Sequence, residues 1–328
     1  MSDTYTEARE GGITELLEAE SSYINDLQIL VDLLHVGLRP YLSQQDQCTI
    51  FGNIEDILAP SLDLLHTLQQ LKADGYLYVD RVGDVLLKRA LNLGAYVSYG
   101  ANYPEAIGLL QRREAGNPHL ERALEEASKL AFIPRFGLKH LLSRPISRVA
   151  RYHLILGYIA EYTPPGQDRD LINEAIALMR DTIVRMDKGF RESQTRERLR
   201  ELCSNMWVGA ERVDLAHLTE YLGQRKVVKE GTVFKARSSQ KLKMVLCNDI
   251  VFLLTQGHKL YVPPISLHNL HLRQGEDGLS FSLILPGMEG DEVHLKAEVN
   301  KERIEWIMAL SKGINDAADA RKAAAHNG

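Results

Sequence analysis

Along roughly the first 205 residues, apolar side chains recur every three or four positions, a spacing typical of amphipathic helices. The segment ELLEAESSYINDL, residues 15–27, illustrates it with an apolar stripe that includes Leu16, Tyr23 and Leu27. Because glycine and proline interrupt helices, breaks are expected at Gly37 and Pro40, Pro60, Gly75, Pro104, Gly116 to Pro118, Pro134, and residues 163–166. The pattern predicts an all-helical domain over residues 8–205.

After residue 226 the pattern changes to short apolar runs separated by turn signals, which is typical of β-strands. Seven such runs follow one another: EGTVFKARS, KLKMVLC, DIVFLLT, HKLYVP, ISLHNLHL, LSFSLIL and EVHLKAEV. The next segment, NKERIEWIMALSKGIND, returns to helical spacing, with Asn300 as a suitable N-cap. We therefore predict a seven-stranded barrel or sandwich capped by one C-terminal helix.

These patterns divide the chain into two domains with a connection and a tail. The predicted order is a helical domain at residues 8–205, a linker at 206–225, a β domain at 226–316 and a tail at 317–328. The tail has no apolar stripe, so it is expected to be frayed. The fold class is multidomain, an elongated helical bundle followed by a small β domain.

The composition indicates which kinds of partner the chain could bind and which cellular compartment it suits. The chain has 328 residues, 45% of them hydrophobic, enough for two cores. Its formal net charge of -5 argues against a nucleic-acid partner, which would need a basic surface. Cys48, Cys203 and Cys247 are too scattered for a disulfide framework or a zinc site, which predicts a reducing, cytoplasmic compartment. The sequence has neither an apolar run of transmembrane length nor a signal-peptide pattern.

Motifs of covalent catalysis are missing from the sequence. It contains no glycine-rich phosphate loop, no HisGluXXHis motif and no nucleophile elbow. We therefore expect no covalent chemistry and no cofactor.

Glu20 is the feature of the first helix that calls for an explanation. It falls in phase with the apolar stripe, and an unpaired carboxylate is costly to remove from water. A second segment, residues 138–159, carries on one face the row Arg144, Ser147, Arg148 and Arg151. This row fits a solvated face with local ion pairs or a binding surface. Pro145 within it favours a helix start or a kink.

Together these segments resemble the Dbl-homology domain of Rho-family guanine-nucleotide exchange factors. The resemblance rests on ELLEAESSYINDL and LLSRPISRVARYHLIL, with IFGNIEDIL and VGDVLL in the family's order between them. The second half resembles a pleckstrin-homology domain through KVVKEGTVFKA, LCNDIVFLL and a C-terminal helix carrying Trp306. The resemblance covers about residues 10–315 and implies tandem Dbl-homology and pleckstrin-homology domains.

The family resemblance also implies a function and a set of partner-binding residues. A chain of this kind promotes GDP release from a Rho-family small GTPase by remodelling its switch regions, and prefers the nucleotide-free form. Glu20 would lie on an exposed seam and accept hydrogen bonds from the GTPase, leaving its replacement harmless to the fold. Ser147, Arg148, Arg151 and Asp187 would complete the exchange surface. The internal alternative for Glu20 is an ion pair with Arg148 or Arg151 of a neighbouring helix.

A basic stretch in the second half suggests an anionic surface as a further partner. Between residues 226 and 243, six basic side chains oppose only Glu230. The tentative phosphoinositide-binding set is Lys235, Arg237, Lys241 and Lys243. It would recruit the chain to the inner face of the plasma membrane, although lysines on a solvated hairpin edge are equally consistent with the pattern.

One alternative keeps the same folds without exchange activity. Ser147 stands where the family usually has a glutamine, and Asp187 where it has an asparagine. The chain would then be a GTPase-binding or phosphoinositide-binding scaffold.

Overall fold

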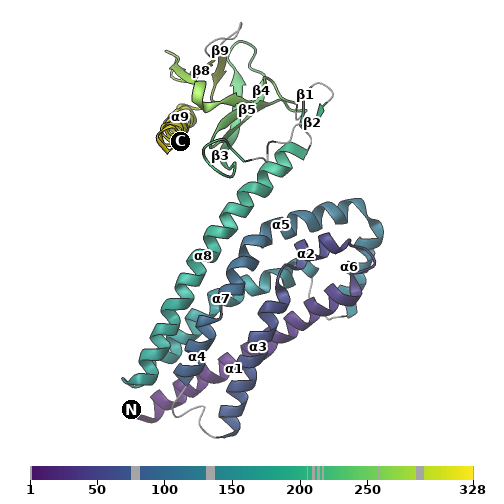
Figure 1. The fold of residues 1–328 in the computed structure, drawn as a ribbon, viewed down its shortest axis with the longest axis vertical. Coiled ribbons are helices and arrows are strands. Elements are labelled where there is room, and N and C mark those ends of the chain that lie inside the picture. Colours follow the sequence, from purple (N-terminus) through teal and green to yellow (C-terminus); the bar gives the residue numbers. More distant parts are fainter. Residues whose placement is uncertain are drawn as a thin grey trace. The chain divides into compact units, whose positions relative to one another are not determined.

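The computed structural model describes residues 2–74, 82–130, 137–204, 206–208, 211–212, 215, 218–257, 259–285 and 292–327. It divides into two compact units, Met1–Gln194 and Thr195–Gly328. The boundary falls inside one long helix. Figure 1 labels the elements.

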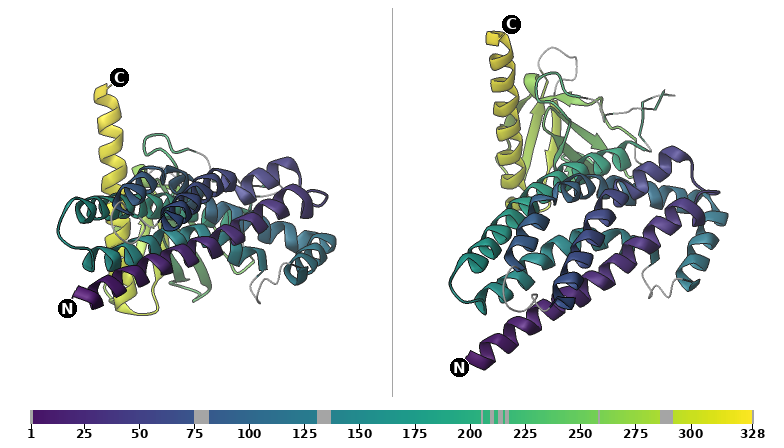
Figure 2. Two further views of the ribbon diagram at one scale, coloured as in Figure 1. Left: turned by 90° about the horizontal axis from the view of Figure 1, so that it is seen from below. Right: turned by 60° about the horizontal axis from the view of Figure 1, so that its bottom comes forward.

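The N-terminal unit is helical throughout its described part. Its elements are α1 (Ser2–Asp32), a π-helical turn (Leu33–Gly37), α2 (Gln44–Phe51), α3 (Ile54–Ala73), α4 (Val82–Leu91), α5 (Gly94–Gly116), α6 (Pro118–Leu130), α7 (Gly137–Glu161) and the first part of α8 (Gln167–Ser204). The views in Figure 2 show α1, in purple, running the length of this unit. One continuous apolar core joins all these helices.

Three prolines lie inside helices where the sequence suggested breaks or a kinked start. Pro60 is in α3, Pro104 in α5 and Pro145 in α7. Each helix has buried residues on both sides of its proline, so tertiary packing outweighs the missing backbone hydrogen bond. The breaks expected at Gly75 and Pro134 lie outside the described residues.

The C-terminal unit contains a seven-stranded antiparallel sheet, as the sequence predicted. Its order is β6-β5-β4-β3-β9-β8-β7. The strands are β3 (Val227–Lys235), β4 (Lys241–Cys247), β5 (Ile250–Leu254), β6 (Ile265–Ser266), β7 (His271–Gln274), β8 (Ser280–Ile284) and β9 (Glu292–Lys296). A separate two-stranded ribbon pairs β1 (Trp207–Val208) with β2 (Glu211–Arg212).

Two of the seven predicted strand segments were assigned wrongly. In HKLYVP, Leu260 forms only an isolated bridge to Leu254, and His258 lies outside the described residues. The run ISLHNLHL is split into β6 and β7 by a 3-10 turn at Leu267–Asn269. The predicted number of seven strands is therefore correct, but one predicted strand is not part of the sheet and another contains two strands.

The central strands of the sheet are buried on both faces. Along β4, Leu242, Met244 and Leu246 face one apolar cluster, whereas Val245 and Cys247 face another. The first cluster includes Trp306 and Leu310 of α9 (Asn300–Asn327), and the second includes Leu199 and Leu202 from the end of α8. Gly231 of β3 favours this close packing, because an added Cβ would lie 3.1 Å from the Trp306 ring. Figure 2 shows α9, in yellow, along one side of the sheet.

The expectation of a frayed C-terminal tail was wrong. Helix α9 continues to Asn327, and Ala317 is fully buried in the cluster that contains Trp306. Alanine has the highest helix propensity, so the alanine-rich end extends the helix without an apolar stripe of its own.

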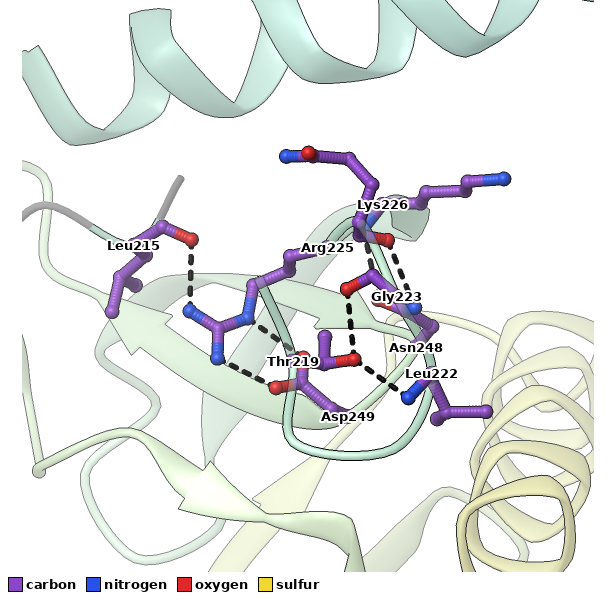
Figure 3. Close-up of polar contacts among 9 residues, drawn as sticks. Leu215, Thr219, Leu222, Gly223, Arg225, Lys226, Asn248 and Asp249 are labelled. Carbon is purple, nitrogen blue, oxygen red and sulfur yellow. Dashed lines mark hydrogen bonds and ion pairs between the residues drawn. The ribbon is translucent and has the colours of Figure 1, made fainter. Parts of the chain in front are cut away.

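The segment before the sheet is held by a compact set of polar contacts (Figure 3). Arg225 donates from Nε and Nη2 to the two carboxylate oxygens of Asp249, at 2.7 and 2.6 Å. Its Nη1 donates to the backbone carbonyl of Leu215 at 2.8 Å. Thr219 accepts a hydrogen bond from the backbone N–H of Leu222 and donates one to the carbonyl of Gly223. Both side chains of the Arg225–Asp249 pair are largely shielded from water.

Replacing Arg225 with Ala should lower the free energy of unfolding of the C-terminal unit by about 3 kcal/mol, because it leaves Asp249 shielded and unpaired. Native-state hydrogen exchange of the β4 and β5 amides in the full chain measures this loss. Arg273→Ala, which removes an exposed ion pair with Glu292 in the same unit, is the control and should change it by less than about 0.5 kcal/mol. Equal protection in the two variants would contradict the anchoring role of Arg225.

Candidate functional site

The two segments that carried the sequence argument, residues 15–27 and 138–159, lie on α1 and α7, which pack against each other in opposite directions. Asp26 of α1 meets Arg144 near the start of α7, at 2.5 Å from carboxylate to Nε. At the other end, Gly12 approaches Tyr158 and Ile159 so closely that an added Cβ would lie 2.9 and 3.0 Å from their side chains. Glycine at residue 12 therefore permits the close contact of the two helices.

Glu20 lies at the centre of this contact and is fully buried. Its Oε2 accepts hydrogen bonds from Arg148 Nε at 3.1 Å, Arg148 Nη2 at 2.5 Å and the Tyr152 hydroxyl at 2.6 Å. The expectation that Glu20 lies on an exposed seam was wrong. The internal ion pair is the alternative that the structure supports, with Arg148 as the partner.

Arg148 is itself buried, with 4% of its surface exposed. Its guanidinium lies 4.3 Å from the centre of the Tyr152 ring and 5.7 Å from that of Tyr23. Burial favours the neutral form of Arg148, but neighbouring Tyr152 and Glu20 outweigh it and hold its pKa above the ordinary value. Arg148 is thus a charged core residue whose guanidinium is already bound to Glu20.

The polar core extends from this pair to three further helices. Arg89 of α4 donates from Nη2 to Ser61 Oγ of α3 at 2.9 Å and to the Tyr96 hydroxyl of α5 at 2.8 Å. The Tyr96 and Tyr23 hydroxyls are 3.1 Å apart, and Arg89 also lies over the Tyr152 ring. Five helices are therefore joined through one buried polar network, held by hydrogen bonds and by the contacts of Arg89 and Arg148 with tyrosine rings.

Burial also sets the protonation of the network's tyrosines. It raises the pKa of Tyr23 and of Tyr152 well above the ordinary value. Their hydroxyls stay protonated near neutral pH, so Tyr152 remains a donor to Glu20. The sequence offered no signal for Arg89 and Tyr96, because neither stands in a recognisable motif.

Ser147 and Arg151 of α7 are exposed above this core. They line a small hollow of about 80 Å³ between α1 and α7. Its other lining residues are Ala19, Ser22, Tyr23, Arg144 and Arg148. Ser147 also donates to the carbonyl of Ser143 at 3.2 Å. The structure thus brings three of the predicted residues to one hollow, with Glu20 buried at the same helix contact.

Asp187 is not among the residues that line this hollow. It is exposed on α8 and pairs with Arg191 four residues further on, at 2.6 Å. In this structure the Asp187 carboxylate is thus paired within its own helix.

Two exposed carboxylates of α1 were missed by the sequence analysis. Glu15 and Glu18 precede Ser22 by seven and four residues, so all three follow one exposed stripe, and Ser22 belongs to the hollow. The signal was available in the sequence, since these positions lie outside the apolar stripe that contains Glu20.

The basic residues of the C-terminal unit flank the turn between β3 and β4. Lys235 ends β3, and its Nζ lies 3.8 Å from the centre of the Tyr261 ring. Lys243 of β4 pairs with Glu230 at 3.0 Å, whereas Arg237 and Lys241 are exposed. A hollow of about 420 Å³ opens beside them, lined among others by Glu230, Thr232, Lys241, Lys243, Thr255 and Gln256.

The positive charge of this region is smaller than the sequence suggested. Lys229 pairs with Glu305 at 2.9 Å, and Lys243 with Glu230.

Within the described residues, there is no grouping of three or more His, Cys, Asp or Glu side chains that could hold a metal ion. Nor does that part of the chain include a helix with the length and apolar character to span a bilayer.

Comparison with known proteins places this architecture among characterised relatives. The RhoGEF domain model matches residues 13–187. Intersectin-1 from Homo sapiens is 26% identical over 333 residues, which covers 92% of this chain but 19% of that protein. The crystal structure of the DH/PH domains of p115-RhoGEF has a TM-score of 0.78 at 18% identity, covering 95% of this chain and 94% of that one. The DH/PH fragment of PDZRHOGEF in complex with human RhoA has a TM-score of 0.69 at 18% identity, with 95% of each chain covered. The chain therefore has the fold of these tandem structures and spans about a fifth of the length of intersectin-1.

Replacing Glu20 with Ala should destabilise the N-terminal unit, because Arg148 would remain buried without its carboxylate. Removing one partner of a buried pair costs about 3 to 5 kcal/mol, which corresponds to a fall in thermal midpoint of roughly 6 to 20 °C. Differential scanning calorimetry measures the change. Glu18→Ala, on the exposed side of the same helix, is the control and should leave the midpoint nearly unchanged. Equal midpoints for the two variants would show that the Glu20 pair does not support the fold.

Proposed function

The chain belongs to the RhoGEF family, and we propose that it promotes GDP release from a Rho-family small GTPase. The single observation that carries the proposal is the match of the family model over residues 13–187, more than half of the chain. PDZRHOGEF, whose DH/PH fragment has the same fold, is bound to human RhoA in its structure. The domain order of this chain, helical unit then seven-stranded sheet and C-terminal helix, is the one expected for such a factor.

The proposed mechanism uses binding energy alone. The chain binds the nucleotide-free GTPase more tightly than the nucleotide-bound form, because it holds the switch regions in a shape that weakens the nucleotide site. By linkage, nucleotide and factor then lower each other's affinity by the same ratio. GDP leaves, GTP enters and the factor dissociates. No bond is made or broken by a residue of this chain, and no cofactor is needed.

We place the exchange surface on the exposed strip where α1 and α7 lie side by side. Glu15 and Glu18 supply carboxylate acceptors from α1, and Arg151 supplies a cation from α7. Ser147 lines the hollow between the two helices, and Asp187 of α8 would form a separate contact. Glu20 and Arg148, both buried, are assigned to positioning: their ion pair fixes the distance and register of the two helices that present the strip.

A scaffold without exchange activity is the second candidate, and one observation favours it. Ser147 and Asp187, which replace the family's usual amide side chains, both bond within their own helices in this structure. Such bonding of both side chains within their own helices is what we expect of a chain that binds the GTPase without loosening its nucleotide.

We propose in addition that the C-terminal unit meets an anionic membrane surface. Lys241 and Arg237 are exposed, and Lys235 and Lys243 lie close to them on the adjoining strand ends. Each basic side chain near an anionic leaflet contributes roughly 1 kcal/mol, so this group suits a weak, peripheral attachment. The proposal implies a cytoplasmic protein recruited to the inner face of the plasma membrane.

Release of fluorescent GDP from a panel of Rho-family GTPases tests the exchange activity. At micromolar chain concentration, at least one GTPase should lose GDP faster than it does alone. Glu15→Ala, Glu18→Ala and Arg151→Ala remove groups that the GTPase would desolvate, and truncating such a contact costs roughly 2 to 5 kcal/mol. At least one of these variants should slow release by roughly 30-fold or more, with the thermal midpoint unchanged.

Glu125→Ala, an exposed carboxylate of α6, is the matched control for this assay and should exchange like the wild type. Binding of a GTPase with no acceleration of release would favour the scaffold. If neither binding nor release is seen with any member of the panel, both candidates fail.

The membrane proposal predicts salt-dependent sedimentation with anionic liposomes. Lys235, Lys241 and Lys243 replaced together by Ala should reduce the bound fraction, since exposed charges act only within roughly 10 Å at 0.1 M salt. Lys301, Lys312 and Lys322 of α9 replaced together by Ala remove the same total charge and serve as the control. Equal loss in both triple variants would assign the attachment to net charge and contradict a local site.

A further inference from the structure

We infer that Glu230 is a built-in competitor for phosphate groups in the hollow between β3, β4 and the end of β5, and that it couples occupation of this hollow to the last turns of α8. The inference rests on the proposed anion-binding role of the C-terminal unit and goes beyond it by naming a carboxylate that opposes binding. The ligand class is a molecule with neighbouring phosphate groups, either a phosphoinositide headgroup or a free inositol phosphate.

The walls of the hollow supply donors that suit phosphate oxygens. Lys241 and Lys243 point from alternate positions of β4, the spacing that places both on one face. Hydroxyl groups of Thr232 and Thr255 and the amide of Gln256 complete this lining. Among the described residues, Lys241 makes no ion pair, so it is available for a first phosphate contact.

Glu230 also lines the hollow, and its carboxylate already pairs with Lys243, the second lysine of the lining. Lys243 Nζ lies 3.0 Å from Glu230 Oε2. Partial burial would raise the pKa of Glu230, but hydrogen bonds from Arg198 and Lys243 lower it, so the carboxylate is ionised near neutral pH. A phosphate group at Lys243 would have to take this lysine from Glu230 and would meet a like charge beside it. Glu230 therefore reduces the affinity of the hollow for polyanions.

The second partner of Glu230 comes from α8. Arg198 donates from Nε to Oε1 at 2.9 Å and from Nη2 to Oε2 at 3.0 Å, the two-point geometry that suits a guanidinium and a carboxylate. Arg198 also bonds Glu201 one turn further along the helix, at 2.8 Å. All of these residues belong to the C-terminal unit. The end of α8 is thus joined to the hollow by one shared carboxylate.

The direction of the coupling follows from the shared contacts. Arg198 draws the negative charge of Glu230 away from Lys243 and so assists an incoming phosphate. Loss of Arg198 would leave Glu230 to Lys243 alone and weaken anion binding. Reciprocally, an anion that displaces Glu230 from Lys243 changes the bonding of Arg198, because coupling between two sites acts equally in both directions.

Isothermal titration of the full chain with soluble inositol trisphosphate tests the inference. Glu230→Gln removes the competing charge with little change in shape and should tighten binding about tenfold. Glu292→Gln, which breaks a charge pair with Arg273 elsewhere on the same sheet, is the matched control and should change affinity less than twofold. Arg198→Gln should weaken binding several-fold.

Equal affinity of Glu230→Gln and the control would overturn the inference while leaving the anion site itself intact. If Lys241→Ala and Lys243→Ala also fail to change the titration, the anion site fails as well. Exchange activity is measured separately, so its outcome is independent of both results. The same variants on phosphoinositide vesicles separate the two sources: a gain on vesicles as well assigns the site to the lipid headgroup, and a gain in solution alone assigns it to a free inositol phosphate.

Hydrogen exchange of the α8 amides tests the coupling directly, because an effect confined to the hollow would not change it. Saturating inositol trisphosphate should change the exchange rates of the α8 amides near Arg198 in the wild type. In Glu230→Gln this response should be lost, although binding is tighter. An unchanged response in the variant would exclude Glu230 as the link to α8.

Discussion

The ion pair between Glu20 and Arg148 determines how the helical unit is assembled. A carboxylate and a guanidinium are both removed from water at the contact between α1 and α7, and neither is tolerated there without the other. The Tyr152 hydroxyl adds a donor to the same oxygen, and its ring lies against the guanidinium. Such a pair demands a particular register of the two helices, because a shift of one residue would leave two charges buried alone.

The rest of the helical core is consistent with this constraint. Arg89 introduces a second buried guanidinium, bonded to neutral hydroxyl groups of Ser61 and Tyr96. Hydroxyl groups can bond to a cation without adding a further charge, and burial keeps the tyrosines in this form. The polar network therefore specifies how five helices meet, while the surrounding apolar residues supply most of the driving force. The exposed strip of α1 and α7 is carried on this rigid base.

The C-terminal unit uses ion pairs differently, at the edges of its apolar clusters. Arg225 and Asp249 anchor the segment before β3, and Arg198 and Lys243 share Glu230 beside an open hollow. The first pair is shielded and serves the fold. The second group is partly exposed, so its partners can be exchanged for those of a ligand at modest cost. This difference in burial is the reason that we assign regulation to Glu230 and structure to Arg225.

Periodicity along the chain was sufficient to predict the two kinds of domain, five of the seven strands and the C-terminal helix, because side-chain spacing reflects burial on one face of a helix or strand. It also placed Glu20 in phase with the apolar stripe, but the family resemblance suggested an exposed seam, whereas the structure shows Glu20 buried. Its partner was decided only by the tertiary structure, since Arg148 is 128 residues away and several arginines share its local pattern. The same holds for the prolines inside α3, α5 and α7. In each case packing against distant residues outweighed a local preference of one or a few kcal/mol.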